Sequence, residues 1–467
     1  MGLLIFLFAL AGMVWLVPVL RAGRMMPLLT ICMIAGVVSG PSFFAIDGPI
    51  QISLDRMMLV GVVGVLLIRM RMGQMHWAAL TRTDALIAFL VGYFLLSCMR
   101  GGAVPDGSSP VARWLFFVAA PATFYAIGRQ IRLTEADLRL FQNTMLVLGF
   151  YLSLTAVFEV MGLRQFVFPR YINDPKSWEF FGRGRGPLLN PVANGMLITL
   201  SLTLAAVRLF QRPWQEKVFY AGLILLMSAG TYASLTRSVW LGAIAALGVV
   251  ALVHTPRWVR VLGLAVAVLL AGGMAMGLKD QLLSIKRDKN LSAVEAAKSI
   301  ELRPLLATVA WEMFKDKPLV GHGYGHYFEH APPYHTIRSH GLPLERVRPY
   351  MQHNVFLSIL VDTGLTGLAA FGLILSMIAA MAWRLARDPL TLSTTRATGL
   401  AMLGFLAGYV INGMFHEVAV MEMVNVFLLS LSGLTVAAYQ YGVKEHDERA
   451  FNELALVSGR PVCYRPA

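Results

Sequence analysis

The stretch Tyr350-Met351-Gln352-His353-Asn354-Val355-Phe356-Leu357 marks the point at which a long polar, histidine-rich segment gives way to a long apolar one. A run of about 20 apolar residues crosses the hydrocarbon core of a bilayer as an α-helix. His353 and Asn354 are therefore expected where a water-facing loop meets the membrane. Ionisable side chains at such a boundary are candidates for chemistry.

The composition outside this stretch is that of a membrane protein. The chain has 467 residues, of which 57% are hydrophobic and 14% are charged, whereas roughly a quarter of the residues of a soluble protein are charged. The apolar runs have helical length and lack the alternation of a membrane β-barrel. We expect an all-α, polytopic membrane helix bundle of about 12–13 transmembrane helices with a large external loop domain. The expected spans are residues 3–20, 27–45, 53–68, 84–99, 112–128, 138–162, 191–207, 218–233, 237–253, 258–278, 354–383, 397–414 and 420–441.

Arginine and lysine occur in alternate short loops, and this pattern predicts the orientation, because such loops remain in the cytoplasm. The N-terminus is then outside, and so are the segments 164–190 and 279–352. The third expected span, 53–68, is short and is the weakest prediction of a membrane-spanning helix. If it does not cross the membrane, the orientation of everything before it is reversed. The loops expected in the cytoplasm carry Arg21 and Arg24; Arg69, Arg71 and Arg82; Arg129, Arg132 and Arg139; Arg208, Arg212 and Lys217; Arg257 and Arg260; and Arg384, Arg387 and Arg396.

These loops also account for the net charge of +14, so we do not expect nucleic acid as a partner. The three cysteines are far apart, which argues against a disulfide framework. The chain is expected to divide into N-terminal transmembrane helices (1–163), an external basic loop (164–190), central transmembrane helices (191–278), a large external loop (279–352), C-terminal transmembrane helices (353–441) and a cytoplasmic tail (442–467).

Both external segments have features that topology does not explain. The basic loop has five arginines and lysines where the positive-inside rule asks for few, and contact with lipid phosphate is the alternative to a binding site. The larger loop is expected to form a lid. Within it, apolar residues recur at helical spacing until Pro318, which predicts an amphipathic helix on the membrane surface; they are Leu302, Leu306, Val309 and Met313.

Three helices enter the membrane from the outside with a distinctive residue at their start. Asn190 is expected to cap the helix that begins at Pro191, just after Arg183 and Arg185. Arg237 falls in the first turn of another helix. An arginine there opposes the helix dipole unless an anion is bound, and the guanidinium group suits a diphosphate.

His353 opens the third of these helices, where the dipole disfavours the charged imidazole. It is therefore expected to be neutral and to act as a general base, the alternative being a capping or interfacial role. Asp362 lies half a turn round the helix from His353 and ~13 Å deeper, so the two are not paired. With Gly364 and Gly367, Asp362 indicates a loosened or closely packed helix.

Weaker signals are expected to be structural. The glycine-rich stretch 321–325 predicts a tight turn, since it lacks the spacing of a phosphate loop. Three neighbouring histidines could bind a metal if they shared one side of a continuous helix; they are His322, His326 and His330. The nearby glycines and Pro332-Pro333 argue against such a helix. Packing between helices or contact with the lid is the expected role of His416, Glu417 and Glu422.

Several stretches resemble the O-antigen ligase and polymerase superfamily. They are Gly184-Arg185-Gly186-Pro187-Leu188-Leu189-Asn190-Pro191, Thr236-Arg237-Ser238, Arg303-Pro304, the run Pro318-Leu319-Val320-Gly321-His322-Gly323-Tyr324-Gly325, and His353-Asn354 followed by Thr363-Gly364. The resemblance covers roughly residues 183–367. The sequence departs from the pattern at Asp362, where the family usually has glutamate, and in its count of thirteen spans, where about twelve is usual.

The resemblance implies a GT-C-type glycosyltransferase of the bacterial inner membrane whose active site faces the periplasm. It would take an undecaprenyl-diphosphate-linked glycan as donor, pass the glycan to an acceptor glycan, a lipid or a protein hydroxyl, and use neither a metal nor a nucleotide cofactor. Membrane lipids are the other expected partners. The implied catalytic residues are His353 and Arg237. The donor diphosphate would be bound by Arg237 with Arg183 or Arg185, and the site would be supported by Asn190, Asn354 and Arg303.

Two points stay open in the sequence. Ligase and polymerase share this donor chemistry, and Arg183 and Arg185 fit the same position. One alternative function is a polysaccharide or lipid-linked glycan transporter or flippase, although the charges cluster at one face rather than at the midplane. A metal-dependent oligosaccharyltransferase would rest on Asp47, Asp55 and the histidines.

Overall fold

The structure is a computed structural model. It describes residues 24–40, 43, 45–46, 51–102, 109–175, 179–263, 265, 293–388 and 391–442, and the side chains of the segment from 293 are described from Glu301 onward. The predicted first span and the cytoplasmic tail lie outside this part, as does the predicted tenth span beyond residue 265, although residues 257–263 are helical.

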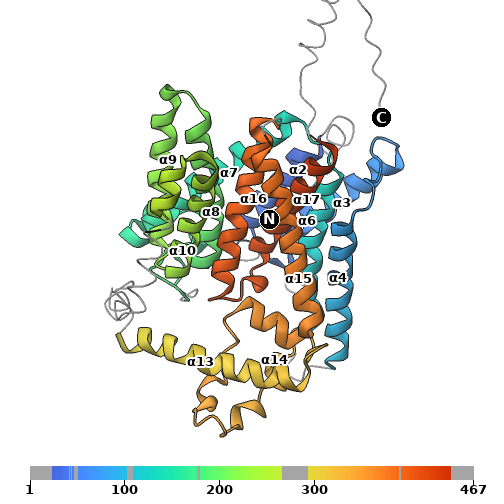
Figure 1. Ribbon diagram of the computed structural model, residues 1–467, viewed down its shortest axis with the longest axis vertical. Helices are drawn as coiled ribbons and strands as arrows, with labels where there is room; N and C mark the ends of the chain where they lie inside the picture. The colour runs from blue at the N-terminus through green and yellow to red at the C-terminus, as the bar shows by residue number, and fades with distance from the viewer. Residues whose placement is uncertain are drawn as a thin grey trace, which may run out of the picture.

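The described chain is almost entirely helical, and most helices stand side by side in a bundle (Figure 1). One short hairpin, β1 (Ala45–Ile46) with β2 (Ile52–Ser53), is antiparallel and pairs Ala45 with Ser53. The α-helices are α2 (Met25–Val38), α3 (Leu54–Arg71), α4 (Arg82–Arg100), α5 (Pro110–Trp114), α6 (Ala120–Gln130), α7 (Glu135–Met161), α8 (Pro191–Gln211), α9 (Trp214–Ala233), α10 (Arg237–His254), α13 (Ala293–Asp316), α14 (Tyr327–His330), α15 (Val355–Arg387), α16 (Ser393–Gly413) and α17 (Glu422–Tyr441). A π-helical turn, Leu115–Ala119, joins α5 to α6, and 3-10 turns lie at Arg164–Phe166, Arg170–Asn173, Tyr334–Thr336, Leu344–Val347 and Val418–Val420.

The prediction of an all-α polytopic membrane protein is confirmed. Within the described ranges, seven stretches are long and apolar enough to span a membrane, namely Arg82–Arg100, Pro110–Gln130, Glu135–Met161, Pro191–Gln211, Arg237–His254, Val355–Arg387 and Glu422–Tyr441. The second predicted helix, 27–45, is wrong at its C-terminal end, because α2 stops at Val38 and Ala45 belongs to the hairpin. Gly40-Pro41 explains the stop, since a residue before proline disfavours the helical conformation.

Contacts between helix ends show which of them lie at the same face of the bundle. On one, which we call the arginine-loop face, Arg24 bonds to Asp137 and Arg129 bonds to Ala79 O and Gln440. These residues belong to loops predicted to share one side of the membrane. The opposite end, which we call the lid face, carries the starts of α8, α10 and α15 and the segment Ala293–Gln352, which we call the lid (Figure 1).

Helix α3 crosses between the two faces, although its sequence made it the weakest predicted span. At its start, Arg56 bonds to Glu422 at 3.1 Å, at the lid-face end of α17. Beyond its end, Ala79 N bonds to the hydroxyl of Tyr441 at the opposite end of the same helix. Its 18 residues extend ~27 Å, close to the thickness of the hydrocarbon core. These contacts therefore place the two ends of α3 at opposite faces of the bundle.

Helix α15 is broken where a segment of the lid enters it. Gly364 has φ +67° and ψ −170°, which no helix contains. Around this break, Leu365 N donates to Pro318 O at 2.8 Å, while His322 N donates to Val361 O at 2.9 Å. A Cβ atom at Gly364 would lie 2.3 Å from the carbonyl carbon of Leu319, so the close approach requires glycine. The predicted loosening of this helix is confirmed, and the glycine-rich stretch that follows Pro318 is its partner.

The lid has a small apolar core of its own. The predicted stripe on α13 is confirmed, because all four of its residues are buried. The stripe does not face lipid, because it packs against the rest of the lid, including Tyr327, Leu344 and Val347, and against Val361 of α15. These apolar residues, which come later in the chain, give the stripe a dry surface within the protein.

Candidate functional site

The three helix starts singled out by the sequence share one backbone geometry. Asn190 Oδ1 accepts hydrogen bonds from the backbone N–H groups of Val192 and Ala193 at the start of α8, and Asn354 does the same for α15. The predicted Asn190 cap is confirmed. The residues before the three caps are Leu189, Leu235 and His353, and their φ angles are +51°, +49° and +49°. Side-chain-bearing residues rarely adopt this left-handed conformation, and such strain collects at functional sites.

The connection between α16 and α17 holds two of these starts together, those of α10 and α15. Met414 O accepts from Asn354 Nδ2 at 3.1 Å, which ties the connection to α15. Two residues further on, His416 Nε2 lies 3.0 Å from the hydroxyl of Ser238, which ties it to the first turn of α10. Arg237 and His353 are each adjacent in sequence to one of these bonded residues. The structure therefore ties the first turns of α10 and α15, which lie more than 100 residues apart in the chain, to one connection.

The lid places a cation beside the histidine. The guanidinium group of Arg303, on α13, lies 5.0 Å from the ring centroid of Phe415 in the α16–α17 connection. The side chain of His353 is exposed. Its neighbours still remove part of its hydration, and this desolvation lowers the pKa of His353 below 6.5. The positive charge of Arg303 lowers the pKa further. A neutral imidazole at neutral pH is the form that accepts a proton.

A buried acid lies under the His353 backbone. Glu417 is 6% exposed, and its carboxylate faces the backbone N–H groups of Gln352 and His353. Arg113, from α5, lies 3.7 Å from the same carboxylate. Burial raises the pKa of Glu417 to about 7, although Arg113 opposes the rise. The sequence predicted that Glu417 packs between helices or contacts the lid. In the structure its carboxylate supports the peptide segment Gln352-His353.

The structure of the basic loop distinguishes Arg183 from Arg185, which the sequence could not. Arg185 is 1% exposed, and its guanidinium donates to the carbonyl oxygens of Glu179 and Ile172, each at 2.7 Å. Its Nε lies 3.8 Å from the Glu159 carboxylate. Arg183 is half-buried and lies over the ring of Phe180 at 5.6 Å. Arg185 therefore folds the loop, while Arg183 keeps part of its surface open to solvent.

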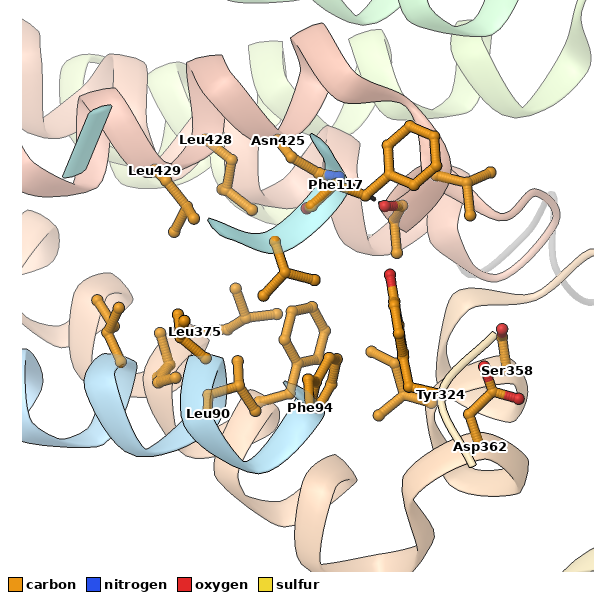
Figure 2. Close-up of a pocket in the computed structure, with 18 of the residues that line it drawn as sticks. Leu90, Phe94, Phe117, Tyr324, Ser358, Asp362, Leu375, Asn425, Leu428 and Leu429 are labelled. Carbon is orange, nitrogen blue, oxygen red and sulfur yellow. Dashed lines mark hydrogen bonds between the residues drawn. The ribbon is translucent and has the colours of Figure 1, made fainter. Parts of the chain in front are cut away.

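A narrow cavity lies in the bundle below the site, between α4, α15 and α17 (Figure 2). Most of its wall is apolar and includes Leu90, Phe94 and Leu375. Its polar end carries Tyr324, Ser358 and Asp362, which Figure 2 shows close together. Gly325 N donates to Asp362 Oδ2 at 3.0 Å, so this acid anchors the glycine-rich stretch. Asp362 and His353 are not paired with each other.

The lid histidines are used in other contacts. His322 Nε2 lies 2.8 Å from Met313 O, and His326 Nε2 lies 2.9 Å from Cys98 O. They do not share one continuous helix, because α14 begins only after His326. Among the residues with described positions, no group of three or more histidines, cysteines and acids has the arrangement of a metal site. Asp47, which the metal-dependent alternative also needs, lies outside the described residues.

Comparison with known proteins identifies the central region. Residues 222–372 match the family model described as O-antigen ligase. This region is similar to the O-antigen ligase family. The match contains Arg237, Arg303 and His353, and with the apolar helices it indicates a multi-pass bacterial membrane protein of polysaccharide biosynthesis. No match to the chain is found among curated proteins.

Several residues that the structure places near the site lie outside the matched region. Asn190 and the basic loop precede it, and Glu417 follows it. Arg113 was not singled out in the sequence, although a signal was present: it lies at the lid-face end of a predicted span, the same criterion that selected Arg237. Its partner Glu417 lies about 300 residues later, so only the fold shows the pair.

Proposed function

We propose that this protein is a membrane glycosyltransferase that moves a glycan from an undecaprenyl-diphosphate-linked donor to a hydroxyl acceptor. The single observation that carries the proposal is the convergence of His353, Arg303 and the α10 start with Arg237 around the α16–α17 connection. The reaction takes place at the lid face, which is periplasmic when the arginine-loop face is cytoplasmic. The acceptor is a glycan or a lipid, as in the ligases and polymerases of the family.

In this reaction the acceptor oxygen attacks the anomeric carbon of the donor sugar. The new C–O bond forms as the bond between that carbon and the diphosphate oxygen breaks, and the acceptor proton passes to His353. The lipid diphosphate leaves with the electron pair of the broken bond. Arg237 and Arg183 bind the diphosphate and stabilise its growing charge, which is where such contacts lower the barrier most. Arg303 keeps His353 neutral before the proton arrives.

The apolar cavity below the site supports a lipid-linked donor. Its walls of leucine, isoleucine and phenylalanine suit a hydrocarbon chain, and it lies within the bundle rather than on the lid. A prenyl chain held there would place its diphosphate near the helix starts. The lid then covers the sugars, since α13 lies across the end of the bundle (Figure 1).

One observation favours the transporter alternative, because broken membrane helices are typical of transporters. Such breaks leave backbone groups free to bind a substrate or an ion. In α15 the corresponding groups bond to the lid instead, as the carbonyls of Val361 and Asp362 accept from His322 N and Gly323 N at 2.9 Å each. The break therefore serves attachment of the lid, and glycan transfer remains the better-supported function.

The test uses a strain that lacks the native gene and carries a plasmid copy. His353→Ala and Arg237→Ala are each expected to lower glycan transfer at least about a hundredfold, read from the glycan ladder at equal protein level. His340→Ala is the matched control, because this lid histidine is exposed and bonds to Glu312, an acid of the same lid. Full transfer by either site variant would overturn the proposal. Turnover of a lipid-linked glycan by purified protein in detergent, where no gradient exists, would exclude the transporter.

A further inference from the structure

A second cavity, distinct in chemistry from the apolar one, lies at the lid face. It has a volume of about 240 Å³, and helix ends surround it: the end of α2 and the first turns of α3, α8 and α17. Its polar lining consists of Asp55, Asn190 and Glu422, and its apolar lining includes Phe117 and Leu188. All its lining residues are buried or half-buried.

Asp55 is the unusual member of this lining. It is 8% exposed, and its Oδ1 atom has no hydrogen-bond partner among the residues that the structure describes. Glu422, by contrast, is paired with Arg56 at 3.1 Å. An acid in the first turn of a helix is favoured by the helix dipole, which explains why Asp55 tolerates its position. The dipole does not satisfy the oxygen atom, and a buried polar atom without a partner calls for a ligand or a water.

The lining matches the chemistry of a sugar. The carboxylate of Asp55 accepts hydrogen bonds from hydroxyl groups, and Asn190, whose oxygen is occupied by its cap, offers its amide N–H groups. The ring of Phe117 provides a flat apolar wall. A cavity that holds one water needs only ~10–15 Å³, so this one has room for a far larger guest. A bare cation would leave most of it empty.

The position of the cavity indicates which sugar it receives. Pro187 and Leu188 line it, and they follow Arg183 and Arg185 on the same loop. The sugar closest to the diphosphate in a lipid-linked donor is the one that such a loop can reach. Resting on the proposed function, we infer that this cavity is a subsite for a pyranose unit of the donor glycan, with Asp55 as the residue that recognises its hydroxyl groups.

The test measures binding separately from transfer. The probe is the oligosaccharide released by mild acid from the lipid-linked glycan that accumulates in the deletion strain. It is titrated into the full-length protein in nanodiscs, and the dissociation constant is measured by calorimetry. Asp55→Asn is expected to weaken binding about tenfold to a hundredfold, as the loss of hydrogen bonds to a charged group does. Asp316→Asn, on an exposed lid residue, is the matched control and is expected to bind like the wild type.

A second variant covers the case in which Asp55→Asn fails to fold. Leu188→Phe fills the cavity without a change of charge and is expected to weaken binding as well. The inference is overturned if folded Asp55→Asn or Leu188→Phe binds as the wild type does, if the wild type does not bind the oligosaccharide, or if sodium or magnesium chloride alone produces the Asp55-dependent signal. Failure of the proposed function looks different: His353→Ala would keep full transfer, whatever the binding result. If the function and the inference both hold, His353→Ala binds the oligosaccharide normally and does not transfer it.

Discussion

The two faces of the bundle differ in how fully their acidic side chains are hydrogen-bonded. On the arginine-loop face, Asp137 accepts hydrogen bonds from Thr134 and Arg24, and Asp84 accepts from Tyr125 and Thr81. On the lid face, two buried carboxylates keep an oxygen atom without a hydrogen-bond partner in the described structure; they belong to Asp55 and Asp362. The carboxylates of the first face are thus bonded by its own residues, whereas these two are only partly bonded.

Backbone conformation differs in the same direction. In the part of the chain with described positions, four residues other than glycine have a left-handed φ, and all four lie toward the lid face; they are Phe180, Leu189, Leu235 and His353. Unsatisfied acids and strained backbones cost stability, and folded proteins retain them where function requires it. This difference supports the proposed placement of the chemistry at the lid face.

Apart from the substitutions of His353 and Arg237, the largest effect is expected at Arg303. Arg303→Ala removes the cation beside His353 and is expected to lower transfer about a hundredfold, in the range seen when one charge-stabilising group is lost. Arg346→Ala provides the control, because Arg346 forms an exposed pair with Glu301 on the same lid. Transfer is measured from the glycan ladder at matched protein level. Equal losses in both variants would mean that the lid needs positive charge in general rather than at Arg303.

The pH dependence of transfer is expected to change next. A base works when neutral, so kcat/KM should fall as the pH drops through the pKa of His353, which lies below 6.5. Arg303 helps to lower that pKa. Arg303→Gln should therefore raise it and move the acid limb of the profile to higher pH, while Arg346→Gln leaves the limb in place. A limb that stays fixed, or moves to lower pH, would contradict the assignment of His353 as the base.

A smaller effect, of another kind, is expected on the arginine-loop face. Asp137→Ala removes the capping box of α7 and the bond to Arg24, which should cost about 1–2 kcal/mol of stability. Thermal unfolding in detergent measures this loss. Transfer per folded molecule should not change, since Asp137 lies at the far end of the bundle. A selective loss of activity there would break the division between the two faces.

The smallest effect is expected at Leu235. Glycine adopts its φ of +49° without strain, whereas a β-branched residue does not. Leu235→Gly and Leu235→Val both lose side-chain atoms, so comparing them with each other rather than with the wild type reduces the contribution of lost packing. The glycine variant should be more stable than the valine variant by about 1 kcal/mol, as measured by thermal unfolding. If valine is the more stable, the left-handed residue is not a source of strain.

The sequence was informative wherever structure is local. Asn190-Pro191 predicted a helix start to the residue, because a cap and a first-turn proline act within one turn. The spans were located by runs of apolar residues for the same reason. The end of the second span was missed, since a two-residue strand gives almost no signal.

Contacts between distant segments could not be predicted. Arg183 and Arg185 are equivalent in the sequence, and only the carbonyls of Ile172 and Glu179 show which of them is buried. The stripe on α13 has the same spacing whether it meets lipid or protein. Likewise, nothing near Asp55 in the sequence indicates that α8 and α17 surround it. Such facts depend on packing between elements, which a single sequence does not encode in any local pattern.

The junction at Gly364 has a consequence for the making of the protein. The lid is synthesised before α15, yet its Pro318–Gly323 segment bonds to backbone groups of that helix. The nascent lid must therefore wait outside the membrane, unfinished, until the translocation machinery has delivered α15 beneath it. The yield of folded protein then depends on the order in which the chain is delivered to the membrane.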